Sequence, residues 1–340
     1  MIVARFGAGR ICKMGEAMKN YLYVSTSGDG WTNLGTDEWF LEHVGPDDLA
    51  LYFYINENAV IIGRNQNPWA ECDLNAMERD KVQLVRRITG GGAVYHDRGN
   101  LNFSFIAGSE RYDQDRQLRL ILGAVRALGI PCEATGRNDL AVEGRKFSGN
   151  AFCKRSKVKQ HHGTLLVASD LDQLQKYLRV DPRKLRSKGT KSVRARVCNL
   201  SDFLPGLRVE ALLEALKSAF AREYGGYETL KTEDLPWTDV RPYIEKHASW
   251  DWRLGETPQF DFEVEERFPW GNAQLLFTLR HTRVEDVRVY TDALDTELSD
   301  EIRARLLGCR FGSEPLAQAL EASDKAQARE VGAFIRAQGL

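Results

Sequence analysis

Several features common in membrane proteins, redox proteins and nucleic-acid binders are missing from this chain of 340 residues. No run of about 18 apolar residues occurs, so no transmembrane helix is predicted. The six cysteines form no C-x-x-C pair, which argues against a zinc ribbon or a redox motif and favours unpaired thiols in the cytoplasm. Lys and Arg number 47 against 48 Asp and Glu, so no strongly basic domain marks a nucleic-acid binder, although a local basic patch stays open.

Common nucleotide-binding and hydrolase motifs are also absent. The chain has no Gly-Lys pair and therefore no P-loop, the nearest match being the segment 189–192. Cys12 replaces the third glycine of a dinucleotide fingerprint after Gly7-Ala8-Gly9. There is no G-x-S-x-G elbow and no H-E-x-x-H helix. His161 and His162 are adjacent, so their side chains point in different directions and a shared metal is not expected.

Hydrophobic periodicity predicts a mixture of strands and helices. Strands are predicted at 49–55 and 59–63, joined in a hairpin at 56–58, and at 82–86, 93–95, 101–106 and 165–167, with helices at 73–80, 114–128, 171–178 and 209–220. Irregular alternation with frequent hairpins favours an α+β fold, a mixed sheet with packed helices, over a doubly wound parallel sheet.

A change of composition near residues 248–272, which hold three tryptophans and two prolines among many charges, predicts a domain boundary. Beyond it, a hairpin of 274–280 and 285–290 followed by three helices predicts a small α+β domain. We therefore expect domains at 21–249 and 250–340, after an extension of unknown role at 1–20.

Three segments concentrate polar chemistry. The first has Arg87 before the glycine run Gly90-Gly91-Gly92. Consecutive glycines weaken a sheet but let a backbone approach a ligand and direct N–H groups at an anion, and an arginine suits phosphate. A tight turn with surface arginines is the plainer alternative.

The second segment is a predicted hairpin between Leu140 and Ala151 that turns at Glu143-Gly144. Lys146 then lies on the return strand, with Gly149 nearby to admit a ligand. A lone lysine is more often a solvated charge, and that alternative stays open on this segment alone.

The third segment runs from His161-His162-Gly163 to a basic loop with seven cations between Arg183 and Arg196. The loop lacks the interleaved aromatic residues with which single-strand binders stack bases. A solvated surface, a nucleic-acid patch and a loop that closes over a phosphate ester are all compatible with this composition.

Taken in order, these strips resemble the lipoate–protein ligase A family. The resemblance is carried by RRITGGGAVYHDRGNLNFSF, GRNDLAVEGRKFSGNA, HHGTLLVASDL and KGTKSVRARVCNL, and extends through VIIGRNQNPWAECD, SWDW and ERFPWGN. It covers the chain from about Tyr21 to the C-terminus, and it implies a catalytic domain at 21–249 and an accessory domain at 250–340.

The resemblance implies an ATP-dependent, AMP-forming ligase. Lipoate's carboxylate attacks the α-phosphate of ATP, and the lysine of an acceptor lipoyl domain then takes the lipoyl group and releases AMP. Mg²⁺ is expected as the phosphate counter-ion. The implied acceptors are E2 subunits of 2-oxoacid dehydrogenase complexes and the glycine cleavage H protein, with no nucleic acid or membrane partner and a monomeric state.

The resemblance also implies site residues, with Lys146 as the catalytic cation between carboxylate and α-phosphate. Those implied for ATP or the adenylate are Arg87, Gly92, Ala93, Val94, Tyr95, Asn138, Asp139, Lys146, Lys188, Gly189, Ser192 and Arg194. Those implied for lipoate are Lys146, Gly91, His96, Ser148, Gly149, His162 and Gly163, and Asp139 is the candidate magnesium ligand.

Two alternatives of other classes remain. Related octanoyl and lipoyl transferases use a cysteine without ATP, and Cys198, near Arg194 and Arg196, or Cys153 could serve in that way. A non-catalytic lipoate-binding protein is the other alternative, against which the presence of both Lys146 and Arg87 argues.

Overall fold

The computed structural model describes residues 19–135, 139–178, 197–254 and 262–338. These residues fall into two compact units. The larger unit takes in the described residues up to Ile61, together with Asp73–Val85 and Val94–Arg253. The smaller unit takes in Ile62–Cys72, Arg86–Ala93 and the described part of Leu254–Leu340. Two inner segments of the chain therefore group with its C-terminal part.

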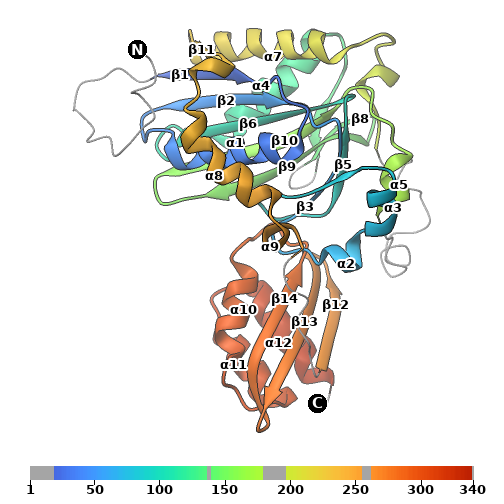
Figure 1. Ribbon diagram of the computed structural model, residues 1–340, viewed down its shortest axis with the longest axis vertical. Coiled ribbons are helices and arrows are strands. Elements are labelled where there is room, and N and C mark those ends of the chain that lie inside the picture. The colour runs from blue at the N-terminus through green and yellow to red at the C-terminus, as the bar shows by residue number, and fades with distance from the viewer. Residues whose placement is uncertain (1–18, 136–138, 179–196, 255–261, 339–340) are drawn as a thin grey trace. The chain divides into compact units, whose positions relative to one another are not determined.

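The larger unit is built on an eight-stranded mixed sheet in the order β11-β1-β2-β6-β10-β9-β8-β7 (Figure 1). Its strands are β1 Asn20–Val24, β2 Leu49–Tyr54, β6 Asn100–Gly108, β7 Glu133–Thr135, β8 Asp139–Val142, β9 Arg145–Lys154, β10 Val158–Leu166 and β11 Glu228–Leu230. The strands β11, β1 and β2 run parallel, and the remaining neighbours pair antiparallel. The expected α+β fold with a mixed sheet is confirmed.

Helices cover both faces of this sheet. The helices α4 (Gln114–Ala127) and α7 (Val209–Tyr224) pack together over one face, and α1 (Gly30–His43) and α8 (Trp237–Ala248) pack together over the other. The remaining short helices of this unit are α3 Leu74–Arg79, α5 Gln173–Tyr177, η2 Leu200–Asp202, η3 Thr232–Asp234 and α9 Trp250–Arg253. None of the helices in the described ranges is long and apolar enough to cross a membrane.

Local sequence accounts for where the principal helices begin. Asp29 caps α1 by accepting from the Thr32 backbone N–H at 2.7 Å, and Asp113 caps α4 by accepting from the Arg116 N–H at 2.9 Å. These bonds satisfy backbone donors that the first helical turn leaves without partners.

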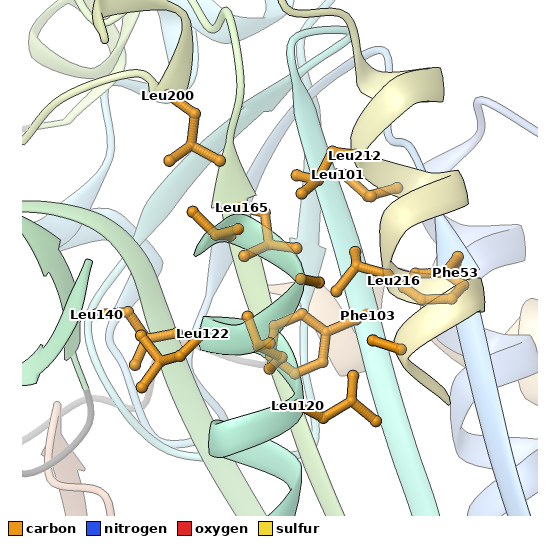
Figure 2. Packing of buried hydrophobic residues seen from close by; sticks show 14 of the residues in the cluster. Phe53, Leu101, Phe103, Leu120, Leu122, Leu140, Leu165, Leu200, Leu212 and Leu216 are labelled. Atoms are coloured by element: carbon orange, nitrogen blue, oxygen red, sulfur yellow. The ribbon is translucent and has the colours of Figure 1, made fainter. Parts of the chain in front are cut away.

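The main apolar core lies between the sheet and the α4–α7 pair. Phe103 of β6 is 1% exposed and packs with Leu120 of α4 and Leu216 of α7 (Figure 2). Alternate residues of β6 face the two sides, so Leu101, Phe103 and Phe105 enter this core while Asn102 and Ser104 face α1. On β6, the apolar side chains thus face the α4–α7 pair and the polar ones face the other side.

A second, three-stranded sheet has the order β4-β3-β5, with β3 Asn58–Ile62, β4 Gln83–Arg86 and β5 Val94–Asp97. The expected strands at 49–55 and 59–63 are present, but the expected hairpin between them is wrong. The strand β2 pairs with β1 and β6, whereas β3 pairs with β5 in the smaller sheet. Asn56 is fully buried and hydrogen-bonded to Asn33 of α1, which directs the chain away from its own preceding strand.

The C-terminal part of the smaller unit has the expected hairpin and three helices, and β12 (Phe262–Phe268) adds a third strand that the sequence did not predict. The strands β12, β13 Gly271–Arg280 and β14 Arg283–Thr291 pair in order, followed by α10 Leu298–Leu306, α11 Ser313–Glu321 and α12 Ala326–Gln338. Phe277, Ile302 and Val331 are buried in its core. The short helix α2, Pro68–Glu71, also belongs to this unit.

Candidate functional site

Lys146 lies where the sequence places it, on the return strand of a tight hairpin. The strands β8 and β9 join at Glu143 and Gly144, whose φ angles are 50° and 73°. Two successive positive φ angles are those of a type I′ turn, which matches the twist of paired strands. A register shift follows between Leu140 and Ala141, and it brings Lys146 and Gly149 to the same face of β9.

The ammonium of Lys146 faces a carboxylate. Its Nζ lies 2.7 Å from Oδ1 of Asp139, and each of the two side chains is 37% exposed. Asp139 pairs directly with Gly149 across the two strands. A Cβ on Gly149 would lie 2.9 Å from the Nζ of Lys146, so the lysine side chain occupies the space that a larger residue at 149 would take. The result is a solvent-accessible cation held in one place.

The neighbouring strand β10 contributes to the same face. The Gly149 backbone N–H donates to the Thr164 hydroxyl at 3.2 Å. On the opposite face, Gly163 allows close strand approach, because a Cβ there would lie 2.7 Å both from the Gly149 carbonyl oxygen and from the Phe103 ring. Gly149 thus makes room for Lys146, whereas Gly163 makes room for the Phe103 ring and the neighbouring strand.

A buried polar pair continues this face toward α1. Nδ1 of His162 lies 3.2 Å from Oδ2 of Asp37, and the two residues are 6% and 3% exposed. His162 and Thr164 are two residues apart on β10, so their side chains share a face about 7 Å apart. The other carboxylate oxygen of Asp37 is buried and has no hydrogen-bond partner among the described residues. The face therefore carries polar groups from Asp37 to Asp139.

His161 faces the other way, as its position next to His162 predicts. Its ring nitrogens lie 3.0 Å from Oε1 of Gln117 on α4 and 2.8 Å from Oδ1 of Asn150 on β9. Complete burial lowers the pKa of His161 to about 3, so its ring is neutral at physiological pH. A neutral ring has one donor and one acceptor, so one of the two amides donates through its NH₂ group. His161 is part of the folded core.

His96, on β5, belongs to a second buried network on the α1 side. Its Nδ1 lies 3.1 Å from Nδ2 of Asn56, whose side-chain oxygen accepts from Asn33 Nδ2 at 2.9 Å. The Tyr52 hydroxyl donates to the side chain of Asn33 at 3.2 Å. His96 is thus connected to α1, the helix that also carries Asp37.

The other predicted residues of β5 lie at the edge of the small sheet. Val94 pairs with Ile61, and Tyr95 pairs with Val60. The Tyr95 hydroxyl donates to Asn58 at 2.9 Å, and burial raises the pKa of Tyr95 to about 12. The Tyr95 ring also stacks on Tyr177 of α5 at 5.8 Å, so its side chain holds α5 against β5.

Arg87 and the glycine run belong to the smaller unit. Arg87 is 9% exposed, and its guanidinium donates to the Gly90 carbonyl at 2.7 Å and the Gly92 carbonyl at 2.9 Å. Gly91 has a φ of 95°, and a Cβ there would lie 2.8 Å from the arginine. Gly92 has nothing within 4 Å of a Cβ position, and Ala93 follows it. In this structure Arg87 shapes the loop that follows it.

The basic segment 183–196 lies outside the described residues, and so do Asn138, Lys188, Gly189, Ser192 and Arg194. The first described residues after it are anchored at the lysine. Val197 pairs with Lys146, and the Cys198 N–H donates to the Lys146 carbonyl at 2.9 Å. The end of the segment is therefore fastened to the strand that carries the lysine.

Cys198 and Cys153, the two cysteines of the transferase alternative, are both buried. Cys198 is fully buried, its thiol donates to the Arg145 carbonyl at 3.3 Å, and burial raises the pKa of this thiol to about 11. Cys153 is 7% exposed. A thiol with a raised pKa is almost entirely protonated at neutral pH, and the thiolate is the reactive form.

Ser148 and Asp139 are the remaining predicted residues close to Lys146 in the chain. Ser148 is fully buried and accepts from the Asn150 side chain, so it faces α4, on the side of β9 opposite Lys146. Asp139 is a single carboxylate, and no group of three or more metal-ligating side chains occurs among the described residues. One carboxylate fits Mg²⁺, which is usually held by one or two carboxylates together with substrate phosphates.

Comparison with known proteins identifies the family. A family model described as the lipoyl protein ligase A/B catalytic domain matches residues 29–221. The chain belongs to the lipoyl protein ligase A/B family. A second model, the bacterial lipoate protein ligase C-terminus, matches residues 257–333, so this lipoyl protein ligase homologue carries both parts.

Solved structures agree with this family. LipL1 of P. falciparum in complex with lipoate is 26% identical, with a TM-score of 0.81 over 94% of this chain and 100% of that one. The bipartite lipoate protein ligase of Thermoplasma acidophilum, described with its E2 lipoyl domain, is 30% identical, with a TM-score of 0.62 over 72% and 100%. A lipoate-protein ligase A bound with ATP is 28% identical, with a TM-score of 0.61 over 70% and 99%.

Sequence reasoning missed several polar residues of this lipoyl protein ligase homologue. Asp37, Thr164, Asn33 and Asn56 all lie on the α1 side of the sheet. The signal that could have found Asp37 is the pair Asp37-Glu38 followed directly by the apolar run Trp39-Phe40-Leu41. Buried carboxylates are rare unless they are paired, which makes such a pair informative.

Proposed function

We propose that this chain is an ATP-dependent lipoate–protein ligase that forms lipoyl-AMP and transfers the lipoyl group to a lysine of an acceptor lipoyl domain. Membership of the lipoyl protein ligase family supports the coarser activity. The observation that supports the AMP-forming reaction is the accessible ammonium of Lys146, held by Asp139 above Gly149. No nucleophilic side chain is needed, because ATP activates the carboxylate.

In the first step an oxygen of the lipoate carboxylate attacks the α-phosphorus of ATP, and the bond to pyrophosphate breaks. Two unit charges of the same sign about 4 Å apart repel by about 4 kcal/mol at an effective dielectric constant near 20. A cation between them removes this repulsion and stabilises the charge of the transition state. Lys146 takes this role, exchanging its contact with Asp139 for contacts with the two substrates.

Asp139 becomes available when Lys146 turns to the substrates. Its carboxylate would hold Mg²⁺, which would supply counter-charge to the phosphates of ATP. The other residues proposed for ATP are Arg87, Gly92, Ala93, Val94, Tyr95, Asn138, Lys188, Gly189, Ser192 and Arg194.

In the second step the amine of the acceptor lysine attacks the carbonyl carbon of lipoyl-AMP. The C–O bond to AMP breaks, an amide forms, and the amine loses a proton. For the lipoyl group we propose His162 with its partner Asp37, together with His96, Gly91, Gly149 and Gly163; Ser148, fully buried on the opposite face of β9, is not part of this proposal. The polar face of the sheet runs from the buried His162 to the exposed Lys146. This supports a lipoyl chain that extends from Lys146 toward His162.

The test is the mass of an acceptor lipoyl domain incubated with lipoate and the protein, with and without ATP. Modification only with ATP supports the ligase. ATP-independent transfer from an acyl-carrier donor, abolished by Cys198→Ser, would replace it with the cysteine transferase, which the buried Cys198 does not favour. Tight lipoate binding without modification of any acceptor would indicate a non-catalytic binding protein.

We also propose that the acceptors are E2 lipoyl domains and the glycine cleavage H protein, that the location is the cytoplasm and that the protein is a monomer. Domains at 21–249 and 250–340 after an extension at 1–20 are proposed as its functional division.

A further inference from the structure

Two segments that precede Lys146 by many residues are structurally part of the C-terminal unit. The first, Ile62–Cys72, is called here the entry segment, and the second, Arg86–Ala93, the glycine segment. Both cluster with the chain after Leu254, which is called the C-terminal module. The proposed function places ligand contacts on the glycine segment, so the contacts that fix the conformation of this segment affect ligand binding.

The two segments are joined to each other by a buried arginine. Arg86 is 8% exposed, and its guanidinium donates to the carbonyls of Gly63, Arg64 and Gln66 at 3.2, 2.8 and 2.7 Å. Burial lowers the pKa of Arg86 to about 10, so it remains charged at neutral pH. The Arg64 N–H also donates to the Thr89 carbonyl at 2.9 Å. The segments therefore behave as one loop structure.

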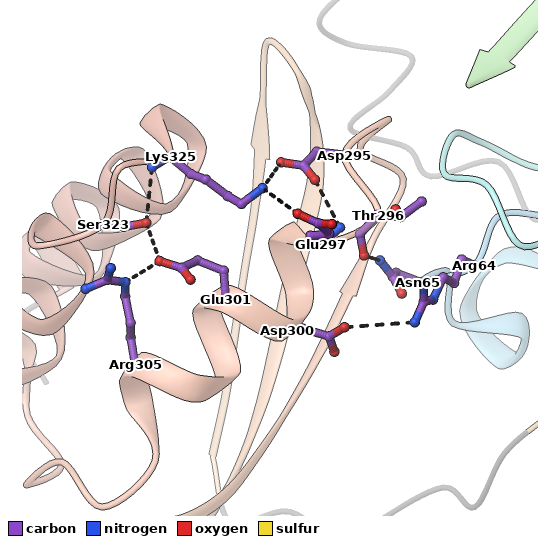
Figure 3. A network of polar contacts seen from close by, with 10 residues as sticks. All are labelled: Arg64, Asn65, Asp295, Thr296, Glu297, Asp300, Glu301, Arg305, Ser323 and Lys325. Atoms are coloured by element: carbon purple, nitrogen blue, oxygen red, sulfur yellow. Dashed lines mark hydrogen bonds and ion pairs between the residues drawn. The ribbon is translucent and has the colours of Figure 1, made fainter. Parts of the chain in front are cut away.

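This loop structure is attached to the end of β14. The Thr291 N–H donates to the Asn65 carbonyl at 2.6 Å, and the Asn65 side chain donates to the Thr296 carbonyl at 3.0 Å. The Gly91 N–H donates to the Ala293 carbonyl at 3.1 Å. Asn65 is thus bonded to the module through both its backbone and its side chain, and Figure 3 shows the side-chain bond to Thr296.

At Gly90 the glycine segment lies directly against the backbone of the C-terminal module. A Cβ on Gly90 would lie 2.3 Å from the Ala293 carbonyl oxygen and 2.8 Å from that of Leu294. Both are backbone atoms, which cannot move aside as the end of a flexible side chain can. Any residue larger than glycine at this position must push the glycine segment away from the module.

Within the module, an ion pair and a hydrogen bond stabilise the region that Asn65 contacts. Lys325 pairs with Asp295 at 2.6 Å, and the Ser323 hydroxyl donates to Glu301 at 2.7 Å (Figure 3). Leu298 and Ile302, just beyond the Thr296 carbonyl, are fully buried. The acceptor that Asn65 uses is therefore on a rigid turn.

We propose that Asn65 and Gly90 are positioning residues through which the C-terminal module holds the glycine segment in its binding-competent conformation. This inference rests on the proposed function. Three successive glycines have more backbone freedom than any other sequence, so an unattached glycine segment samples many conformations. Apparent affinity falls in proportion to the fraction of molecules in the competent conformation. The module thus acts on substrate binding without contributing a side chain to the substrate.

The test uses three full-length variants, Asn65→Ala, Asn65→Asp and Gly90→Ala, in the ATP-dependent lipoylation assay. Asn65→Asp keeps the size of the side chain but loses its donor. We expect each variant to raise KM for lipoate about five- to tenfold, which for the two Asn65 variants is the factor that one lost hydrogen bond accounts for. We expect kcat to stay within about twofold, since saturating lipoate restores the same complex.

The matched control is Ser323→Ala, which removes a buried hydrogen bond of the module without touching either segment. It should lower the melting temperature but leave KM for lipoate unchanged. Hydrogen exchange in the glycine segment should rise in Asn65→Ala and not in Ser323→Ala.

Two results would overturn the inference. One is an unchanged KM in all three loop variants, and the other is an equal rise of KM in Ser323→Ala. A wild-type protein that modifies no acceptor would instead count against the proposed function, so the two failures are distinguishable.

Discussion

Replacing Gly149 by alanine tests the lysine geometry without removing the lysine. A Cβ at this position would lie 2.9 Å from the Nζ of Lys146 and 3.0 Å from its Cε. The Thr164 hydroxyl, at 3.9 Å, would be in ordinary contact. The new methyl group therefore conflicts mainly with Lys146, and the ammonium must move.

The size of the effect follows from these distances. Non-bonded carbon atoms prefer separations of about 3.5–4.0 Å, so the end of Lys146 must retreat by about 0.5–1 Å. A misplacement of about 1 Å at a catalytic group can lower a rate about 10²-fold, which corresponds to about 2.7 kcal/mol. The free energy of unfolding should change little, because a lysine end moves easily and alanine is tolerated in a strand.

The assay is lipoate-dependent release of pyrophosphate from ATP at saturating substrates, with thermal melting of each variant. The control is Gly123→Ala in α4, where a Cβ would have nothing within 4 Å. Alanine there should leave the rate unchanged and stabilise the helix by about 1 kcal/mol. A Gly149→Ala protein with a normal rate would refute the role given to the position of Lys146, and a loss of rate matched by a large loss of stability would refute the steric reasoning.

Three further predictions concern single side chains. Lys146→Ala should lower the rate of adenylate formation by at least about 10²–10³ in the same pyrophosphate assay, and a near-normal rate would contradict the proposed mechanism. Cys198→Ala should keep ATP-dependent lipoylation of an acceptor, because the Cys198 thiol is buried and its pKa is raised to about 11; loss of transfer in a folded variant would favour a cysteine mechanism. His161 has a pKa of about 3 in the folded protein, below its unfolded value near 6.5, so the unfolded chain binds more protons and stability falls as pH drops from about 6.5 toward 3, by up to about 1.4 kcal/mol per pH unit. His161→Gln should make this slope shallower in urea unfolding between pH 4.5 and 7, and identical slopes would show that His161 does not titrate as stated.

For the hairpin that carries Lys146, the local sequence was sufficient to predict the strands and the turn. Alternating residues on both sides of Glu143-Gly144 predict paired strands, and the two positive φ angles confirm the turn. The same reasoning failed at 56–58, although both strands were predicted. Strand formation depends on nearby residues, whereas the choice of partner depends on residues elsewhere. Asn56 is hydrogen-bonded to Asn33 of α1, and nothing in the sequence around 56–58 indicates that contact.

The candidate site likewise combines residues that the sequence identifies with residues that only the structure brings together. Lys146 and its neighbouring glycines could be recognised from the sequence, because the motifs that carry the resemblance are short continuous strips. Asp37 could not, since its partner His162 is 125 residues away along the chain. Ser148 was grouped with Lys146 by proximity in sequence, but alternation along β9 turns it to the opposite face, where it is fully buried.

The sequence by itself determined the class of fold, the family and the lysine on its tight hairpin, because each depends on residues close together in the chain. Only the tertiary structure decided which polar groups share a face of the sheet and that Arg87 bonds to carbonyls of its own glycine run. It also decided that Asn65 and Gly90 belong with β14, more than 200 residues later. Such contacts are selected by packing of the whole chain, where burial requires each polar group to find a partner wherever the fold supplies one.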